Sequence, residues 1–331
     1  MQKKYLETTR MDITRRGLVL AGALAAVAGS AGAQGAYPSK PVKIIVPAPA
    51  GSGPDVMARL YADHLSRALG QQFLVDNKPG ASGNIGAESV AHAPADGHTL
   101  LYAYNQIPTM NPHLFGKLGY DMRKDMAPVS ITLTTGYILL ANNDFPAADL
   151  AQTIAYAKKH PGKVAYASYG PGTASHLAFE IIQEQTRTEF LHVPYKQGQL
   201  TDVMGGQVAM VFEPFPSAIP FAASGKTKAL AVTTPKRLAA LPNVPTMSEA
   251  IPGFDLLGWQ GVWAPAGTPT AVLAKLQSEF ARITQLPDMQ KRIRDFGSEP
   301  VGGSSREMAQ TIEAEYALWG KIIRAKNIRL D

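Results

Sequence analysis

One stretch near the start of the chain decides the fold, and it reads Val42-Lys43-Ile44-Ile45-Val46-Pro47-Ala48-Pro49-Ala50-Gly51-Ser52-Gly53-Pro54-Asp55. The mostly apolar, β-branched beginning predicts a buried strand, and the proline- and glycine-rich middle predicts a loop. Pro54 and Asp55 then predict the start of a helix. Proline lacks the N–H that the first turn leaves unpaired, and aspartate suits the positive end of the helix dipole. The stretch therefore predicts the first half of a βαβ unit.

The same alternation continues after this stretch. We expect the helix to end at Gly70, with strands at 73–76 and 99–104 around a helix at 84–93. This order is typical of a parallel sheet with right-handed crossovers. A second series follows, with elements predicted at 131–141 (one long strand), 150–160 (a helix capped by Asp149), 164–168 (strand), 173–186 (helix), and 190–194, 207–212, 228–233 and 258–264 (strands).

The two series predict an α/β protein of two lobes, each a mostly parallel sheet flanked by helices. The chain is expected to cross between the lobes near 131–141 and 258–264, and the helices predicted within 268–327 return to the first lobe. A cleft between two such lobes is a natural place for a ligand.

Composition excludes several classes of site. The 331 residues contain no cysteine, which excludes disulfides, thiolate zinc sites, Fe–S clusters and a cysteine nucleophile. The formal net charge of +6 could suit a nucleic-acid or membrane partner. Half of that excess lies in residues 1–33, and the remaining 298 residues carry 27 basic against 24 acidic side chains. This balance does not indicate nucleic-acid binding.

Residues 1–33 are predicted to be an export signal. Basic residues precede the short apolar run 17–28, and Ala31-Gly32-Ala33 supplies small residues for cleavage near Ala33. Met11 is an alternative start, since the signal is complete from there. Thr14 to Leu18 resembles a twin-arginine signal, and a general secretory signal stays open as the alternative. The apolar run is too short to span a bilayer.

No enzyme motif can be assembled from the chain. It has no G-x-S-x-G and no H-E-x-x-H, and its seven histidines show no metal-ligand spacing. Gly225-Lys226-Thr227 ends like a phosphate-binding loop, but Pro220 stands where the first glycine of that motif belongs. We therefore predict no catalytic residue, no metal and no cofactor.

Two loops of the same kind remain as candidate ligand-binding sites. They are 48–53, before Pro54 and Asp55, and 168–173, before the helix at 173–186. Free N–H groups and the dipole at a helix N-terminus bind anions, and glycine lets a ligand approach the backbone. One such loop in each lobe could hold a dicarboxylate, or a carboxylate with a polar tail, from both sides. The alternative that these are plain strand-to-helix turns stays open.

Segments spread over the whole chain after residue 33 carry a resemblance to a known family. They are 46–55 with Ala58-Arg59, 76–87, 96–101, 175–178, 192–196, 205–208, 241–246 and 264–269. In this order they strongly resemble the Bug family, the periplasmic substrate-binding proteins of tripartite tricarboxylate transporters.

The resemblance implies a two-lobed, Venus-flytrap binding protein in the periplasm. It would be a monomer that captures a small organic carboxylate and delivers it to a large and a small membrane subunit, without acting as an enzyme. We expect the first lobe at 37–135 and 262–331 and the second at 136–261. A sensor that hands the ligand to a membrane receptor is the first alternative, and an exported enzyme of unknown class is the second.

The family holds its carboxylate with the two loops, which gives a set of expected ligand-binding residues. They are Ala48, Ala50, Gly51, Ser52, Gly53, Asp55, Tyr104, Asn105, Gln106, Ser168, Tyr169, Gly170, Gly172, Thr173, His176 and Glu213. The chain departs from the family pattern at Ser52 and Pro54, at 104–108, at 197–200 and at Glu213, where the family often has aspartate. These departures fall around the expected cleft, so the identity of the carboxylate does not carry over.

Overall fold

The computed structural model describes residues 37–195, 197–254 and 256–330. The predicted export signal at 1–33 lies outside the described residues. The chain divides into two compact units, 1–39 and 40–331, and the fold below is that of the second unit. No helix within the described ranges is both long and apolar enough to cross a membrane.

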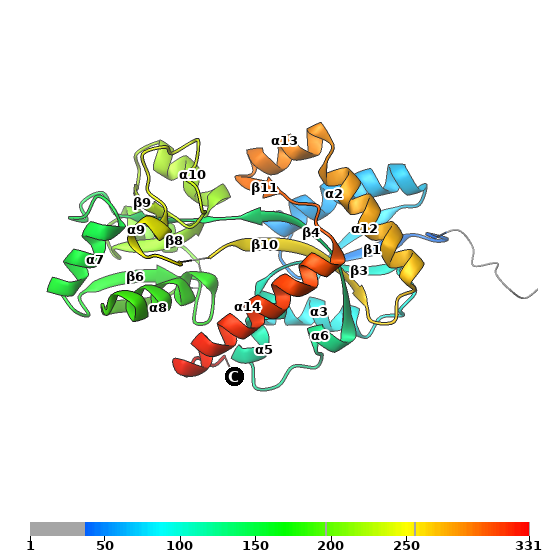
Figure 1. Cartoon of the computed structure of the whole chain (residues 1–331). Coiled ribbons are helices and arrows are strands. Elements are labelled where there is room, and N and C mark those ends of the chain that lie inside the picture. The colour runs from blue at the N-terminus through cyan, green and yellow to red at the C-terminus, as the bar shows by residue number, and fades with distance from the viewer. Residues whose placement is uncertain (1–36, 196, 255, 331) are drawn as a thin grey trace, which may run out of the picture. The chain divides into compact units, whose positions relative to one another are not determined.

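A six-stranded sheet contains the opening stretch of the sequence (Figure 1). Its strand order is β11 (Ser298–Pro300), β4 (Met126–Thr135), β10 (Gly258–Pro265), β3 (Thr99–Tyr104), β1 (Val42–Val46) and β2 (Phe73–Asn77). As predicted, β1 pairs in parallel with β2 and β3. Helix α2 (Gly53–Leu69) has Pro54 in its first turn and ends at Gly70, whose φ of 68° is left-handed. Helix α3 (Asn84–Ala91) follows β2.

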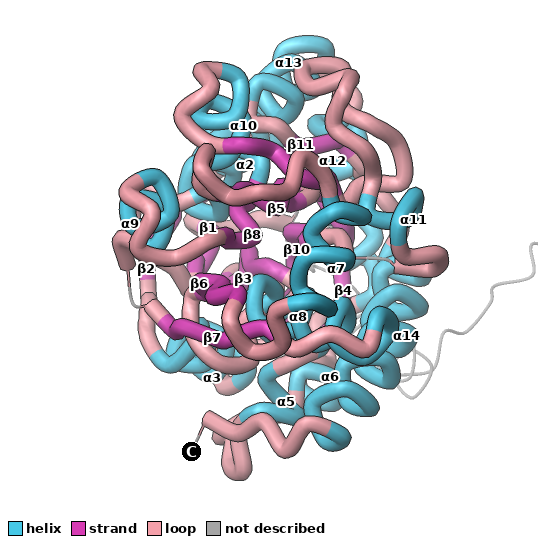
Figure 2. Tube along the Cα trace, turned by 90° about the vertical axis from the view of Figure 1, so that its left-hand side faces the viewer, coloured by secondary structure: helices cyan, strands magenta, loops and turns pink. Residues whose placement is uncertain are grey.

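A five-stranded sheet forms the centre of the second series. Its order is β7 (Phe190–Pro194), β6 (Val164–Ser168), β8 (Met210–Pro214), β5 (Tyr137–Ala141) and β9 (Lys228–Val232). Strand β6 is parallel to β7 and β8, and Figure 2 shows these three strands near one another. Helix α7 (Leu150–Lys159) is capped as predicted, because Asp149 accepts a hydrogen bond from the Gln152 N–H at 2.8 Å.

Both sheets are mixed, whereas the sequence predicted mostly parallel ones. Each antiparallel pair includes a strand next to a crossing between the sheets: β4 or β10 in one sheet, and β5 in the other. The α/β class and the two-lobed architecture agree with the prediction.

The predicted long strand 131–141 is wrong, because the structure divides it at Gly136 into β4 and β5, which belong to different sheets. A side chain at 136 would collide with the ring of Phe215. The Tyr137 N–H turns to the Thr233 hydroxyl at 2.8 Å. The apolar run is therefore continuous in sequence but marks the first crossing between the sheets.

The remaining helices comprise the helix that follows β6, several short connecting helices, and those of the C-terminal part. They are η1 (Ala81–Gly83), α4 (Gln106–Thr109), α5 (Asn111–Leu114), α6 (Met122–Asp125), α8 (Ala174–Thr186), α9 (Gln199–Met204), α10 (Phe215–Ala223), α11 (Met247–Ala250), α12 (Thr270–Thr284), α13 (Pro287–Asp295) and α14 (Ser305–Ala325). Helix α12 packs on α2 and β4, so this part of the C-terminal region returns to the first sheet as expected.

Helix α14 contributes to the cores of both sheets. Its Met308 and Ile312 pack in the core of the six-stranded sheet with Trp263. Its Trp319 and Ile323 pack in the core of the five-stranded sheet. Figure 1 shows the helix running from β4 and β10 toward α8, in agreement with its contacts to β4 and α8. The return of the C-terminal helices to the first lobe is therefore only part of their packing.

Candidate functional site

The first predicted loop joins β1 to α2. Ala48 is buried, and its carbonyl oxygen accepts a hydrogen bond from Asn77 Nδ2 at 3.1 Å, whereas Ala50 is exposed. Gly51 has a φ of 80°, a conformation that favours glycine. A Cβ atom on Gly51 would meet no atom within 4 Å, so the backbone here borders open space.

Asp55 holds this loop in place through hydrogen bonds to both carboxylate oxygens. Oδ2 accepts from the Gly51 N–H at 2.8 Å, and Oδ1 accepts from Asn77 Nδ2 at 2.9 Å. Arg59 adds an ion pair at 2.9 Å. Burial works to raise the pKa of Asp55, but the bonds from Arg59, Gly51 and Asn77 outweigh it and hold the pKa below 3.8. Asp55 is thus committed to the loop and does not offer a free oxygen.

Several polar groups at this loop have no partner in the described part of the chain. They are the N–H groups of Gly53 and Asp55 and the buried Oγ of Ser52, which does not cap α2. A Cβ on Gly53 would lie 3.7 Å from Gln260 Nε2, and Gln260 Oε1 is also buried without a partner. The sequence analysis missed Gln260. Its signal was a single amide within the otherwise apolar strand 258–265.

The second predicted loop joins β6 to α8 and is folded on itself. Ser168 is fully buried, and its Oγ accepts a hydrogen bond from the Gly170 N–H at 3.0 Å. The Thr173 hydroxyl donates to the Gly170 carbonyl at 2.7 Å. Gly172 has a φ of 75°, and a Cβ there would lie 2.5 Å from a methyl carbon of Leu114 on α5. This loop is therefore closely packed where the first is open.

Two histidine rings support the second loop. His192 Nε2 lies 2.6 Å from Ser168 Oγ, and His176 Nδ1 accepts a hydrogen bond from the Gly172 N–H at 3.0 Å. The rings stack with their centroids 4.2 Å apart. Burial lowers the pKa of both histidines to about 4, and His176 adds to the lowering at His192. Both rings are therefore neutral at neutral pH. The sequence analysis named His176 but missed His192.

The first turn of α8 leaves N–H groups available. Those of Ala174, Ser175 and His176 make no hydrogen bond to any described residue. The N–H groups of Tyr169, Gly170 and Gly172 are used inside the loop, with the Tyr169 N–H donating to Ser175 Oγ at 3.2 Å. The anion-binding capacity of this loop thus lies at the helix start rather than at its glycines.

Tyr169 and Glu213 come together as a pair. The Tyr169 hydroxyl donates to Glu213 Oε2 at 2.7 Å, and the same carboxylate accepts from Ser217 Oγ and Gln199 Nε2. Glu213 is 1% exposed, whereas Tyr169 is 42% exposed. The buried carboxylate thus orients an exposed aromatic ring beside the second loop. Burial and the neighbouring Glu213 raise the pKa of Tyr169.

The whole architecture matches one protein family. Residues 57–328 match the family described as the tripartite tricarboxylate transporter family receptor. This chain belongs to that family. It is therefore a solute-binding receptor and not an enzyme, and the resemblance to the Bug proteins is confirmed.

Solved structures agree with this assignment. An R. palustris protein solved with adipate is 34% identical, with a TM-score of 0.79, and the match covers 89% of this chain and 100% of that one. The periplasmic binding protein BugD is 31% identical, with a TM-score of 0.75 and the same coverage. MatC from Rhodopseudomonas palustris, solved with malate, is 31% identical, with a TM-score of 0.74, over 87% of this chain and 100% of that one.

The three predicted residues at the end of β3 and just after it contact different parts of this receptor. Tyr104 is partly buried, and its hydroxyl lies 3.2 Å from where a Cβ on Gly83 would be. Gln106 Nε2 donates to Asn111 Oδ1 at 3.2 Å. Asn105 Nδ2 donates to Glu315 Oε2 at 3.1 Å and to the Leu257 carbonyl at 3.3 Å. Asn105 therefore serves the contact with α14.

Tyr137 links the two halves of the predicted site, next to the first crossing. Burial, with the nearby Glu315, Tyr104 and Glu213, raises the pKa of Tyr137 to about 12. Tyr104 on one sheet and Glu213 on the other thus lie within electrostatic range of one phenol. No hydrogen bond or ion pair between described residues joins 48–55 directly to 168–176.

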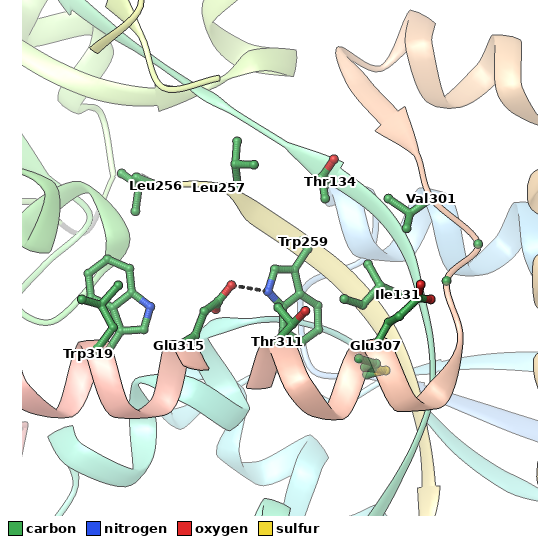
Figure 3. Close-up of a pocket in the computed structure, with 14 residues that line it drawn as sticks. Ile131, Thr134, Leu256, Leu257, Trp259, Val301, Glu307, Thr311, Glu315 and Trp319 are labelled. Atoms are coloured by element: carbon green, nitrogen blue, oxygen red, sulfur yellow. Dashed lines mark hydrogen bonds between the residues drawn. The ribbon is translucent and has the colours of Figure 1, made fainter. Parts of the chain in front are cut away.

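A groove of about 680 Å³ lies away from both loops, beside α14 (Figure 3). Strands β4 and β10 and the segment before β10 supply Thr134, Trp259 and Leu257, and α14 supplies Glu315 and Trp319. Glu315 Oε1 accepts from Trp259 Nε1 at 2.7 Å, and Trp319 Nε1 is buried without a hydrogen-bond partner among the described residues. The groove contains none of the residues predicted to bind the carboxylate.

The receptor shows no candidate metal centre in its described parts, where no group of three or more His, Asp or Glu side chains could hold an ion. His64 Nε2 on α2 lies 3.3 Å from Asp288 Oδ2 on α13, a pair of two residues only. The chemistry that remains is hydrogen bonding by backbone N–H groups, hydroxyls and amides.

Proposed function

We propose that this receptor captures a small organic carboxylate between its two loops, 48–53 and 168–173. The supporting observation is the same for both loops: each leads from a parallel strand into a long helix whose first N–H groups are unpaired. Two helix N-termini offer hydrogen-bond donors and the positive ends of two dipoles without a basic side chain. The adipate- and malate-bound relatives are consistent with this ligand class.

The ligand-binding residues divide into groups with different tasks. Ser52, Gly53, Gln260 and the first turn of α8 would contact the carboxylate, together with Tyr104 and Tyr169. Asp55, Ser168, His176 and Glu213 already have partners and would hold the contacting groups in place. Asn105 and Gln106 would act further from the ligand.

The receptor would work in the periplasm as a monomer and deliver the acid to the large and small membrane subunits of a tripartite transporter. The family to which it belongs supports this part of the proposal. The signal at 1–33 would export it, with cleavage near Ala33. The lobes would be 37–135 with 262–331, and 136–261, and would close on the ligand by rotation at the two crossings.

A thermal-shift screen of the mature protein tests the proposal. Ligands that bind only the folded state raise its melting temperature, with a stabilisation of about 2.7 kcal/mol at a hundredfold excess over Kd. We expect one or more acids from a panel of aliphatic dicarboxylates, tricarboxylates, amino acids and aromatic acids to raise it by several degrees. The matched alcohols and amides serve as controls. If neutral compounds raise the melting temperature and the acids do not, the proposed function is wrong.

A further inference from the structure

The second loop is held by side chains whose hydrogen bonds depend on where the protons are. Ser168 Oγ accepts the Gly170 N–H, so its own hydrogen is free to point at His192 Nε2, 2.6 Å away. With the Ser168 hydroxyl in this orientation, His192 Nε2 is the acceptor and carries no proton. His176 Nδ1 receives the Gly172 N–H and must itself be without a proton. In this arrangement each ring supports the loop in its neutral form.

We propose that His176 and His192 are positioning residues that keep loop 168–173 in its carboxylate-binding conformation only while both rings are neutral, so that acidification releases the ligand. This inference rests on the proposed function of the loop. A histidinium has donors on both nitrogens. A second proton on His176 would oppose the Gly172 N–H, and a proton on His192 Nε2 would force the Ser168 hydroxyl to turn away from it.

The surroundings of the two rings resist a positive charge. Glu180 lies 3.7 Å from His176 Nε2, but Lys326 from α14 already pairs with Glu180 at 3.2 Å and offsets its charge. Tyr166 of β6 stacks on His192 at 4.9 Å and brings no charge. Two stacked histidinium rings 4.2 Å apart would also repel each other. Protons are therefore taken up more readily when the loop has left this arrangement.

This difference couples protons to the ligand. If the loop binds the carboxylate only with both rings neutral, protons and ligand favour opposite states of the loop, and each lowers the affinity of the other. The apparent affinity falls in proportion to the fraction of molecules with both rings neutral. With both pKa values at about 4, that fraction remains high at pH 6 and falls steeply below pH 4.5.

The test compares adipate binding by calorimetry from pH 7 to pH 3.5 in the wild type and in the double variant His176→Asn/His192→Gln. Asparagine Oδ1 stands close to the position of Nδ1, and glutamine Oε1 stands close to that of Nε2, so both acceptors remain but cannot take up protons. Each protein is referred to its own affinity at pH 7, and the protonation of adipate itself cancels in the comparison. His160→Asn, at an exposed histidine outside the loop, is the control.

We expect the wild type and the control to lose about tenfold more affinity than the double variant by pH 3.5. Equal losses in all three proteins would overturn the inference. If adipate does not bind, another acid from the panel takes its place, and the absence of any bound acid would contradict the proposed function instead.

A second measurement needs no ligand and no variant. In an NMR titration of the wild type, the Gly172 amide should shift with the same midpoint as the His176 ring, and the Gly170 amide with that of His192. Amides that remain unchanged while the rings titrate would overturn the inference, whatever the outcome of the binding experiments.

Discussion

The two loops of the predicted site look alike in sequence but are held by opposite kinds of chemistry. Loop 48–53 is held by a charged group, the carboxylate of Asp55, through the Gly51 N–H, Asn77 and Arg59. Loop 168–173 is held by neutral groups, the Ser168 hydroxyl and two uncharged histidine rings. The same strand–turn–helix pattern therefore presents the same kind of backbone donors in both loops. The side chains that hold the two loops in place respond differently to mutation and to pH.

The loops also differ in how closely they are packed. Gly51 borders open space, whereas a side chain on Gly172 would press into Leu114. Both glycines have positive φ, so a substitution strains the backbone in either loop, but only the second loop adds a steric collision. The following predictions test this contrast, beginning with the largest expected effect.

Substituting Gly172 by alanine should be the most damaging single change. We expect Gly172→Ala to lower the free energy of unfolding by about 2–4 kcal/mol, because a collision adds to the strain of positive φ. Gly51→Ala should cost about 1 kcal/mol, from strain alone. Urea unfolding measures both, and carboxylate affinity should fall further in Gly172→Ala. Equal costs at the two positions would mean that packing does not separate the loops.

Removing the Asp55 carboxylate, which holds the first loop, should have the second largest effect. Asp55→Ala leaves the Gly51 N–H without its acceptor and Asn77 Nδ2 with the Ala48 carbonyl alone, and we expect a loss of stability of about 2 kcal/mol and of adipate affinity of about tenfold. Arg59 adds little, since its side chain is 52% exposed. The control is Asp55→Asn, which keeps one acceptor and should lose less. If Asp55→Ala binds adipate as tightly as the wild type, Asp55 does not hold the loop.

As the pH falls, the histidines that hold loop 168–173 should lose their stabilising effect before Asp55 of loop 48–53 does. The folded-state pKa of each histidine is lowered from 6.5 to about 4, so the stability that the neutral rings contribute is present above pH 6.5 and is lost as the pH falls toward 4. The pKa of Asp55 is lowered below 3.8, so its contribution persists through that range.

Unfolding in urea at pH 7, 5 and 4 checks this order. From pH 7 to pH 4 the wild type should lose more stability than His176→Asn/His192→Gln, by up to about 3 kcal/mol for each of the two histidines. Asp55→Asn should follow the wild-type slope over the same range. Parallel curves for the wild type and the histidine double variant would contradict the assignment.

The smallest effect is expected at the ring beside the second loop. Tyr169→Phe keeps the exposed ring but removes the hydroxyl that donates to Glu213, which retains two other donors. We expect a loss of about 0.5–1 kcal/mol in stability and less than threefold in affinity. Tyr195→Phe, which removes a tyrosine bond to Asp202, is a matched control outside the loop. A tenfold loss of affinity in Tyr169→Phe alone would mean that the hydroxyl itself is required for binding.

Local features of these loops could be predicted from the sequence because local residues cause them. Pro54 and Asp55 mark the start of α2, Asp149 caps α7, and glycines stand where φ is positive. The strand–helix series and the two loops also indicated two lobes and a carboxylate ligand, and the family resemblance added the set of ligand-binding residues. Its ligand-binding set as a whole remains a prediction.

What the sequence did not predict depends on contacts between distant residues. The role of His192 depends on Ser168, 24 positions earlier, which only the pairing of β6 with β7 brings within reach. Asn105 was predicted to bind the ligand, yet its amide donates to Glu315, 210 positions away. The break at Gly136 could not be seen in an apolar run, because the ring of Phe215 requires it.

Helix α14 has a consequence for any attempt to exchange lobes between members of this family. Because Trp319, Ile322 and Ile323 belong to the core of the five-stranded sheet, a fragment restricted to 136–261 would carry an uncovered apolar surface. A chimera that takes its second lobe from a relative would bring that surface against a helix selected with another partner. Grafts of ligand specificity should therefore transplant the end of α14 together with the second lobe, or confine the exchange to the two loops.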